Sequence, residues 1–215
     1  MLSFLKKHLA SEASLFNFLD WEEENKALKL INEGKEILAN KVYASLPFIR
    51  KSMMKRLDSC TIALLENGAD PNFRIKKDIF ESTALEEEIQ FKRFKNIKLL
   101  ILYGAKLNKD VSDSLDKNMQ DFIKEMDKLY SLIKQKETLI KHSNSDTEKM
   151  EHYKSLSQLW EEAANDEKNE VYRKNYESKM ELYINLYDAK LKEINNKKAE
   201  EEKETNPLIK KFKIN

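Results

Sequence analysis

The stretch Leu64–Asn72, "LLENGADPN", decides the fold because similar stretches stand before and after it. "LKLINEGKEI" lies at Leu28–Ile37, and "LLILYGAKLN" lies at Leu99–Asn108. Each stretch holds one of the three glycines in the chain, after a run rich in leucine and isoleucine, and successive glycines are 34 and 36 residues apart. Glycine can adopt the left-handed conformation that ends a helix without a Cβ clash. The spacing predicts three repeated units. The three predicted helix ends are Gly34, Gly68 and Gly104.

The composition favours helices and a reducing environment. Of the 215 residues, 36% are charged and 40% are hydrophobic, and the chain has only three glycines and three prolines, which is few for the frequent turns that sheets need. The net charge of +1 predicts no nucleic-acid partner. The single cysteine, Cys60, excludes an internal disulfide and fits a reducing compartment. No apolar run reaches the roughly 18 residues of a membrane-spanning helix.

The N-terminal stretch "MLSFLKKHLASEASLFNFL" is apolar but interrupted by Lys6, Lys7, His8 and Glu12. It therefore lacks the continuous apolar core of a secretory signal. We expect a helix here that covers the end of the first repeat. A helix lying on a lipid surface is the alternative.

Two short helices per unit and a terminal Gly-Ala-Asp-x-Asn resemble the ankyrin repeat. The resemblance covers about half of the chain and is closest in "ALLENGADPN" and "IKLLILYGAKLN". Ankyrin repeats open their first helix with Thr-Pro-Leu-His, and "STAL", "SLPF" and "ASLF" stand at the corresponding places. The chain departs from the pattern: the expected histidine is Glu86, Glu88 replaces a small residue, and the glycine between the paired helices is missing. The resemblance implies an all-α fold in which residues 1–110 form a short solenoid. Its three degenerate repeats would span about residues 13–40, 41–72 and 73–108.

One element of this region is predicted without the resemblance. Thr83 followed by Glu86 is a capping box, in which each side chain accepts a hydrogen bond from the backbone amide of the other residue. Leu85 and Ile89 then lie four residues apart and face the core. The sequence therefore predicts that a helix begins after Thr83.

The ankyrin resemblance implies a protein that binds other proteins through projecting β-turn fingers and the groove beside them. The finger "FRIKKDIFES" at residues 73–82 is longer than usual and mixes aromatic, aliphatic and basic residues, as interface centres do. The alternative is that its apolar residues pack on the next repeat and its lysines are solvated. The predicted partner-binding residues are Phe73, Arg74, Lys76, Lys77, Phe80 and Tyr43.

In residues 111–205 the pattern changes, and the apolar residues form longer stripes. The first stripe has the 3-4 spacing of a coiled coil, and "HSNSD" at residues 142–146 breaks it. A second stripe begins near Met150 and includes Trp160, and a third runs from Tyr172 to Ile194. Three amphipathic helices predict an antiparallel bundle or a long helical hairpin. The tyrosines of the third stripe would form a core seam with hydroxyls reaching water, a partner-binding face or a homodimer contact. The first stripe consists of Met119, Phe122, Met126, Leu129, Ile133 and Ile140.

The tail at residues 206–215 is expected to be flexible. A glutamate cluster followed by terminal apolar residues resembles the secretion signal of type IV-secreted effectors of intracellular bacteria. This resemblance implies an effector delivered into the host-cell cytoplasm, where it would bind a host protein. A eukaryotic or viral ankyrin protein is the alternative. The cluster comprises Glu200, Glu201, Glu202 and Glu204, and the apolar residues are Leu208, Ile209, Phe212 and Ile214.

Signatures of catalysis are scarce. Three glycines cannot build a phosphate-binding loop, and Cys60 and the three histidines are too scattered for a zinc site. Cys60 lies inside a predicted helix, where a buried structural thiol is expected. We therefore predict no catalytic site, no metal and no cofactor, and a non-catalytic protein–protein interaction module. The alternatives are an enzyme with an unrecognised site between the two halves and a self-assembling helical scaffold.

Overall fold

The computed structural model describes residues 12–43, 46–77, 80–165 and 167–205. This part of the chain is mostly helical, with two short antiparallel hairpins, so the predicted all-α class is confirmed. The capping helix expected before residue 12 and the tail after residue 205 lie outside the described residues. The chain divides into two compact units, which are taken one at a time: Met1–Tyr130 with Glu167–Tyr172, and Ser131–Asp166 with Arg173–Asn215.

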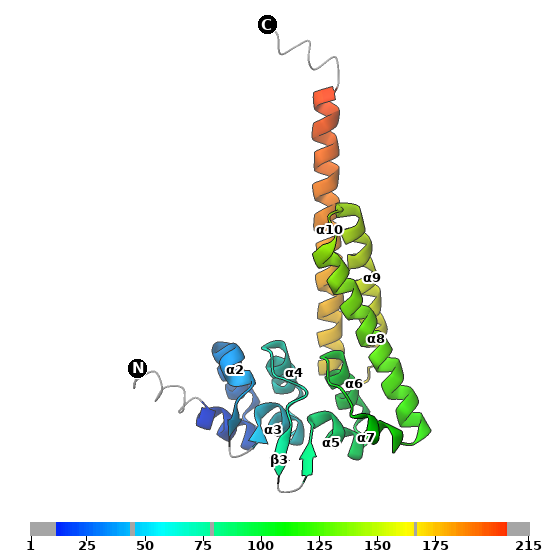
Figure 1. The fold of residues 1–215 in the computed structure, drawn as a ribbon. Coiled ribbons are helices and arrows are strands. Elements are labelled where there is room, and N and C mark those ends of the chain that lie inside the picture. Colours follow the sequence, from blue (N-terminus) through cyan, green and yellow to red (C-terminus); the bar gives the residue numbers. More distant parts are fainter. Residues whose placement is uncertain (1–11, 44–45, 78–79, 166, 206–215) are drawn as a thin grey trace. The chain divides into compact units, whose positions relative to one another are not determined.

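The first unit contains helices in antiparallel pairs, each joined by a tight turn (Figure 1). The second helices of the first two pairs pack against each other, and each short pair packs internally. A two-stranded hairpin precedes each of the last two pairs. The pairs are helix 12–20 with α2 (Glu24–Ala39), α3 (Phe48–Met54) with α4 (Asp58–Glu66), and α5 (Ala84–Gln90) with α6 (Phe94–Leu102). The hairpins are β1 (Val42–Tyr43) with β2 (Leu46–Pro47), and β3 (Ile75–Lys77) with β4 (Phe80–Ser82).

Buried positions recur through the three pairs with spacings of 34 and 36 residues, the spacings that separate the glycines. In each pair, two of these positions lie on the first helix and two on the second. Because they are buried in every pair, the core of this unit is built from equivalent positions. The four sets are Leu15, Ile49 and Leu85; Leu19, Met53 and Ile89; Ala27, Thr61 and Ile97; and Ile31, Leu65 and Ile101.

The turns between paired helices show the same period. Glu22, Arg56 and Lys92 adopt left-handed backbone conformations, with φ of 60°, 58° and 51°. A hydrogen bond from the next residue back to the end of the first helix closes each turn, as in the Schellman motif. The ankyrin resemblance implies a glycine at these turns, and the non-glycine residues that stand there adopt the left-handed conformation. The closing bonds are Glu23 N to Phe18 O (2.8 Å), Leu57 N to Ser52 O (2.9 Å) and Arg93 N to Glu88 O (2.9 Å).

Two of the three glycines end helices as predicted. Gly68 and Gly104 have φ of 87° and 91°, directly after α4 and α6. The prediction is wrong for Gly34, which lies inside α2. A single glycine weakens a helix by only about 1 kcal/mol, and the residues that follow Gly34 are mostly good helix formers. The helix consequently continues to Ala39, and Asn40 is its C-cap residue.

The predicted capping box is confirmed. The Thr83 hydroxyl accepts from the Glu86 amide at 3.2 Å, and a Glu86 carboxylate oxygen accepts from the Thr83 amide at 2.8 Å. Because these bonds satisfy two amides at the start of α5, they fix where the helix begins. Leu85 and Ile89 are buried, as their spacing predicted.

The first unit continues beyond its helix pairs. The Asn108 side chain caps the short helix α7 (Lys109–Asp113), and α8 (Lys117–His142) follows. In the first part of α8, Phe122 packs its ring edge-on against Phe94 at 5.2 Å. The unit reaches Tyr130 and includes Glu167–Tyr172, whereas the sequence analysis placed a boundary at residue 110. The difference arises because the long apolar stripe of α8 begins on helix turns that belong to the first unit.

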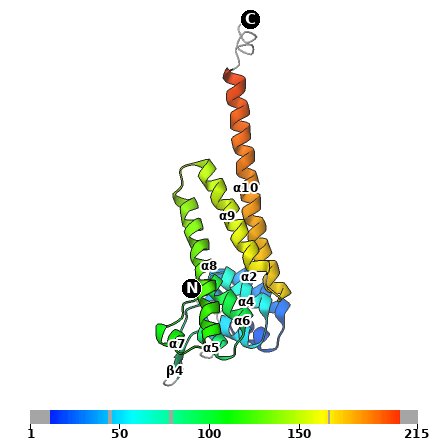
Figure 2. The ribbon, with the colours of Figure 1, turned by 90° about the vertical axis from the view of Figure 1, so that its right-hand side faces the viewer.

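The second unit contains the rest of α8, α9 (Asp146–Asn165) and α10 (Glu170–Thr205) from Arg173 onwards. The predicted break at residues 142–146 is confirmed, since α8 ends at His142 and α9 begins at Asp146. α9 runs antiparallel to α10, and both ribbon views show α10 continuing past the start of α9 (Figures 1 and 2). The contacts that set this direction are Trp160 with Tyr176, Tyr153 with Tyr183, and Asp146 with Lys190 and Lys197.

Candidate functional site

The hairpin predicted to bind a partner is present as β3 and β4. Its backbone register pairs Ile75 with Ser82, Lys76 with Glu81, and Lys77 with Phe80. Asp78 and Ile79, between the strands, lie outside the described residues. Residues 73–82, which the ankyrin resemblance leads one to expect as a projecting finger, contain this antiparallel strand pair.

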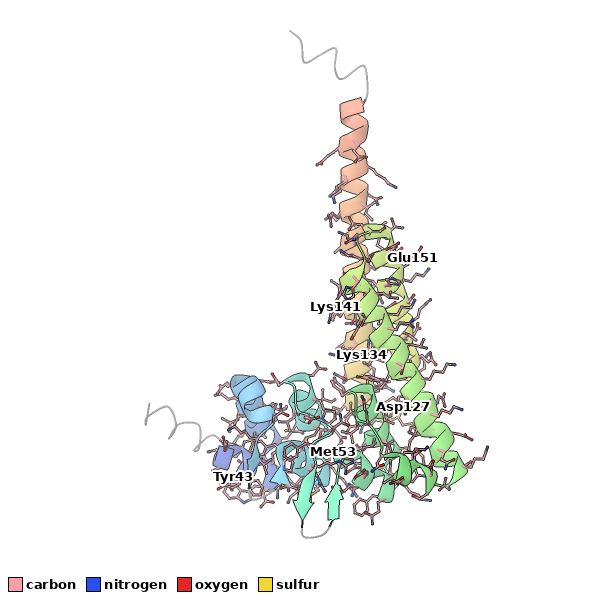
Figure 3. All side chains as sticks on the ribbon, in the orientation of Figure 1. Tyr43, Met53, Asp127, Lys134, Lys141 and Glu151 are labelled. Carbon is pink, nitrogen blue, oxygen red and sulfur yellow. The ribbon has the colours of Figure 1, made fainter. Side chains whose placement is uncertain are left out.

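The predicted partner-binding residues lie on two hairpins. Phe73 is half-buried before β3, and Arg74 is exposed with a guanidinium nitrogen 3.4 Å from a carboxylate oxygen of Glu86. Tyr43 lies on β1, is 37% exposed, and packs its ring 5.0 Å from that of Phe16 (Tyr43 is labelled in Figure 3). The backbones of Lys76 and Lys77 are on β3 and that of Phe80 is on β4, while their side chains lie outside the description. Partner binding by these six residues stays a prediction.

A buried arginine anchors the base of the second hairpin. Arg50 of α3 donates from one guanidinium nitrogen to the Ser82 carbonyl oxygen at 3.2 Å and from the other to the Ser82 hydroxyl at 3.4 Å. It also forms an ion pair with Glu87 of α5. Burial lowers the pKa of the Arg50 guanidinium, and the negative charges of Glu86 and Glu88 oppose that shift. Because α3 belongs to the preceding helix pair, Arg50 fixes this hairpin to two pairs at once.

The sequence analysis missed Arg50. The available signal was a pair of adjacent basic residues, Arg50 and Lys51, in the first turn of a helix that otherwise contains four apolar residues and Ser52. Both are buried in the structure. Lys51 forms an ion pair with Asp20 at 2.5 Å and lies 4.5 Å from the centre of the Phe16 ring. These two cations therefore connect the first helices of successive pairs.

A second exposed feature lies at the turns between paired helices, at the far end of α3 and α5 from the hairpins. Trp21, Met54 and Phe91 are 66%, 58% and 61% exposed, each next to or two residues from a left-handed turn residue. The Lys55 ammonium lies 3.4 Å from Asp20 and 3.8 Å from Glu22, so the first two turns are side by side. Trp21 and Phe91 occupy equivalent positions of their repeats, and Met54 lies one residue before the equivalent position, Lys55. The sequence analysis did not use this signal.

A buried polar cluster connects residues 167–172 with α4 and α6 within the first unit. The Tyr172 hydroxyl lies 3.0 Å from an Asp58 carboxylate oxygen and 2.9 Å from the Asn96 side-chain oxygen. Asp58 also accepts from the Asn169 side chain at 2.8 Å and from the Lys95 ammonium at 2.9 Å. These donors surround the Asp58 carboxylate, and the arrangement is suited to holding residues 167–172 against α4 and α6. The expectation that the tyrosine hydroxyls reach water is wrong for Tyr172, which is fully buried.

Asn96 connects this cluster with a second carboxylate. Its amide nitrogen donates to Glu88 at 2.7 Å, and Arg93 lies 3.2 Å from the same carboxylate group. Burial raises the pKa of Glu88, while Asn96 and Arg93 stabilise the charged form. Glu88 stands where the ankyrin resemblance leads one to expect a small residue, and these two partners explain how the position accepts a carboxylate.

Cys60 has the surroundings of a structural thiol. It is fully buried in α4 and lies 3.7 Å from the Glu24 carbonyl oxygen. Burial, together with the charge of Glu24, raises its pKa to about 12. Since the thiolate is the nucleophile, a protonated thiol at neutral pH is unreactive. Among the described residues, no group of three or more His, Cys, Asp or Glu side chains could hold a metal ion.

The chain matches no protein-family model, no curated protein and no solved structure. Across the ranges that the structure describes, every helix is too short or too polar to cross a membrane.

Proposed function

We propose that the first unit is a short solenoid of three degenerate ankyrin-type repeats, and that it binds another protein without catalysis. The period of the helix pairs supports this proposal. Buried positions and left-handed turn residues recur at spacings of 34 and 36 residues, and the two helix-ending glycines, Gly68 and Gly104, are 36 residues apart. Repeat solenoids use extended surfaces of this kind to bind partners.

A repeated asparagine contact carries the proposal. The Asn40 side chain donates to the Gly68 carbonyl oxygen at 2.7 Å and accepts from the Asp70 amide at 2.6 Å. The Asn72 side chain makes the same two bonds one unit later, to the Gly104 carbonyl oxygen at 3.0 Å and from the Lys106 amide at 2.7 Å. Each asparagine therefore binds the backbone at the equivalent place after the next helix pair. A stack of repeats requires such contacts between successive repeats.

The hairpins are the surface that we propose for the partner. Arg50 and Arg74 hold the second hairpin through Ser82, Glu87 and Glu86, so little conformational freedom is lost there on binding. Tyr43 and the finger residues Phe73 and Phe80 would supply apolar contact area, and Lys76 and Lys77 would favour an acidic partner surface.

The proposed class of partner rests on two features of the chain, its C-terminal tail and its repeats. We propose a bacterial effector that binds a host protein in the host-cell cytoplasm, with the glutamate cluster and apolar tail at residues 200–215 acting as a type IV secretion signal. The support is the resemblance of the tail combined with the repeat character of the first unit.

The binding experiment uses the full chain. Wild type, a Lys76→Glu/Lys77→Glu variant and a Lys29→Glu control are used to capture proteins from a eukaryotic lysate, with mass spectrometry as the readout. Lys29 is highly exposed on α2, away from both hairpins in sequence, and serves as a single charge-reversal control. We expect a set of proteins retained by wild type and by the control but lost by the hairpin variant. Equal retention by all three chains would exclude the hairpin as the binding surface.

The export step has a separate test. A translocation reporter is fused to the N-terminus of the chain and expressed in a bacterium with a type IV secretion system. We expect delivery of the full chain into host cells and loss of delivery when Glu200, Glu201, Glu202 and Glu204 are changed to glutamine. Delivery by the variant at the wild-type level would rule out the cluster as a signal while leaving the binding proposal intact.

A further inference from the structure

An exposed apolar stripe runs along α10 in the second unit. Leu182 and Leu186 are 49% and 37% exposed, and Ala189 is also exposed. At about 100° per residue, these three side chains fall within an arc of about 60° on one flank of the helix. Tyr176 and Tyr183, which contact α9, lie about a quarter turn away. The stripe is therefore not the face that packs inside the unit.

The ends of the stripe carry opposite charges. Lys179 lies on the same flank seven residues before Leu186. Glu193 lies there seven residues after Leu186, and it also pairs with Lys190 and Lys197 of its own helix. The stripe thus reads Lys, Leu, Leu, Ala, Glu with Leu186 at its centre. When two copies are placed antiparallel with Leu186 opposite Leu186, Leu182 meets Ala189 and Lys179 meets Glu193 at both ends. A parallel pair would place lysine opposite lysine and glutamate opposite glutamate, and like charges in that position are destabilising.

We propose that this flank of α10, residues 179–193, binds a second copy of the chain in an antiparallel, two-fold symmetric contact. A two-fold interface uses the same patch on both molecules and must be self-complementary. The palindromic order of charge and apolar residues satisfies that condition. The charged ends set the direction, since exposed ion pairs contribute little to affinity but select against wrong arrangements.

The length of α10 agrees with this partner. α10 has 36 residues and α9 has 20, so they are about 54 Å and 30 Å long. Asp146 at the start of α9 reaches Lys197, and the last eight residues of α10 extend past it (Figures 1 and 2). In the antiparallel arrangement, this acidic end would lie near Arg173 and Lys174 of the second copy. The contact is independent of the hairpins and of the proposed host partner.

The first test is self-association of the full chain. The apolar stripe is small, so the dimer should be weak, and sedimentation velocity is measured from about 5 to about 500 µM. We expect the sedimentation coefficient of wild type to rise over this range and that of Leu182→Glu/Leu186→Glu to stay at the monomer value. Ile184→Glu/Leu191→Glu is the matched control: Ile184 and Leu191 are 41% and 37% exposed on the same helix but about half a turn away from Leu182. A constant coefficient for wild type, or association by the double variant, would overturn the proposal.

The second test distinguishes antiparallel from parallel pairing by disulfide cross-linking. Wild type is the control, because its single cysteine, Cys60, is fully buried. Under mild oxidation we expect Leu186→Cys to cross-link with itself, and Lys179→Cys to cross-link with Glu193→Cys when the two variants are mixed. Lys179→Cys alone should stay monomeric on a non-reducing gel. Self-linking of Lys179→Cys without linking to Glu193→Cys would show a parallel pair and overturn the assignment. Circular dichroism of each variant checks that its helix content is unchanged.

Discussion

The Asn72 side chain spans two successive units of the repeat: its amide nitrogen donates to the Gly104 carbonyl oxygen at 3.0 Å, while its oxygen accepts from the Lys106 amide at 2.7 Å. One side chain thus satisfies two backbone groups beside a helix end, where they have no partner within the helix. Asn40 makes the equivalent pair of hydrogen bonds one repeat earlier.

Replacing Asn72 by alanine should therefore destabilise the first unit. We expect a loss of about 1–3 kcal/mol in the free energy of unfolding, because a donor and an acceptor are left without their partner. Urea unfolding followed by circular dichroism measures the change. Asn17→Ala is the control, since Asn17 is exposed on helix 12–20. An unchanged urea midpoint for Asn72→Ala would show that the asparagine contact between successive repeats contributes nothing to stability.

Replacing a left-handed turn residue by glycine should not lower the free energy of unfolding, in contrast to Asn72→Ala. Arg56 is exposed with a φ of 58°, a conformation that costs a non-glycine residue about 1–2 kcal/mol. Arg56→Gly should leave the free energy of unfolding unchanged or raise it by up to about 1 kcal/mol. The same substitution at Lys29, inside α2, should lower it by about 1 kcal/mol. Thermal unfolding of both variants compares them, and equal destabilisation would argue against a left-handed turn at Arg56.

Tyr172→Phe tests the buried cluster. The substitution keeps the ring and removes the hydroxyl that lies between Asp58 and Asn96. We expect a loss of about 1–3 kcal/mol, since the one hydroxyl proton is removed and the oxygen that accepts it, on Asp58 or Asn96, is left without this donor. Tyr187→Phe on the same helix should change stability by less than about 0.5 kcal/mol because Tyr187 is only partly buried. Hydrogen exchange at residues 167–172 should also become faster in Tyr172→Phe, and unchanged exchange would contradict a holding role for the hydroxyl.

The second unit should lose stability in acid through an ion-pair network. Hydrogen bonds from Lys190 and Lys197 lower the pKa of Glu193 from its ordinary value of 4.5 to about 2. A hydrogen bond from Lys190 also lowers the pKa of Asp146. A carboxyl group whose pKa is lowered by folding stabilises the fold above its ordinary pKa. That contribution disappears as the pH falls from about 4.5 towards 2.

NMR titration of the Glu193 carboxyl carbon measures this pKa directly. Glu193→Gln should make the stability of the second unit less dependent on pH between about 5 and 2, whereas Glu181→Gln, at an exposed position of the same helix, should not. Because Glu193 is exposed, added salt should reduce the difference. A Glu193 pKa near 4.5 at low salt would show that the network does not form in solution.

Local rules explain what could be predicted of the candidate site. The finger at residues 73–82 was expected from the resemblance to ankyrin repeats, and the start of α5 from a capping box whose two residues lie three positions apart. Arg50 was missed because its partners Ser82 and Glu87 lie more than 30 residues away. The exposed apolar turns at Trp21 and Phe91 were missed because exposure depends on the packing of whole helices.

The sequence by itself determined the features that depend on neighbouring residues or on a fixed period. These are the helical class, the spacing of the helix pairs, the capping box at Thr83 and the break between α8 and α9. Only the tertiary structure decided that Arg50 holds the second hairpin through Ser82 and Glu87, and that Tyr172 binds Asp58, 114 residues before it. The physical reason is that helix ends and turns depend on hydrogen bonds within a few residues. The partner of a single buried arginine or tyrosine depends on packing energies of a few kcal/mol contributed by distant parts of the chain.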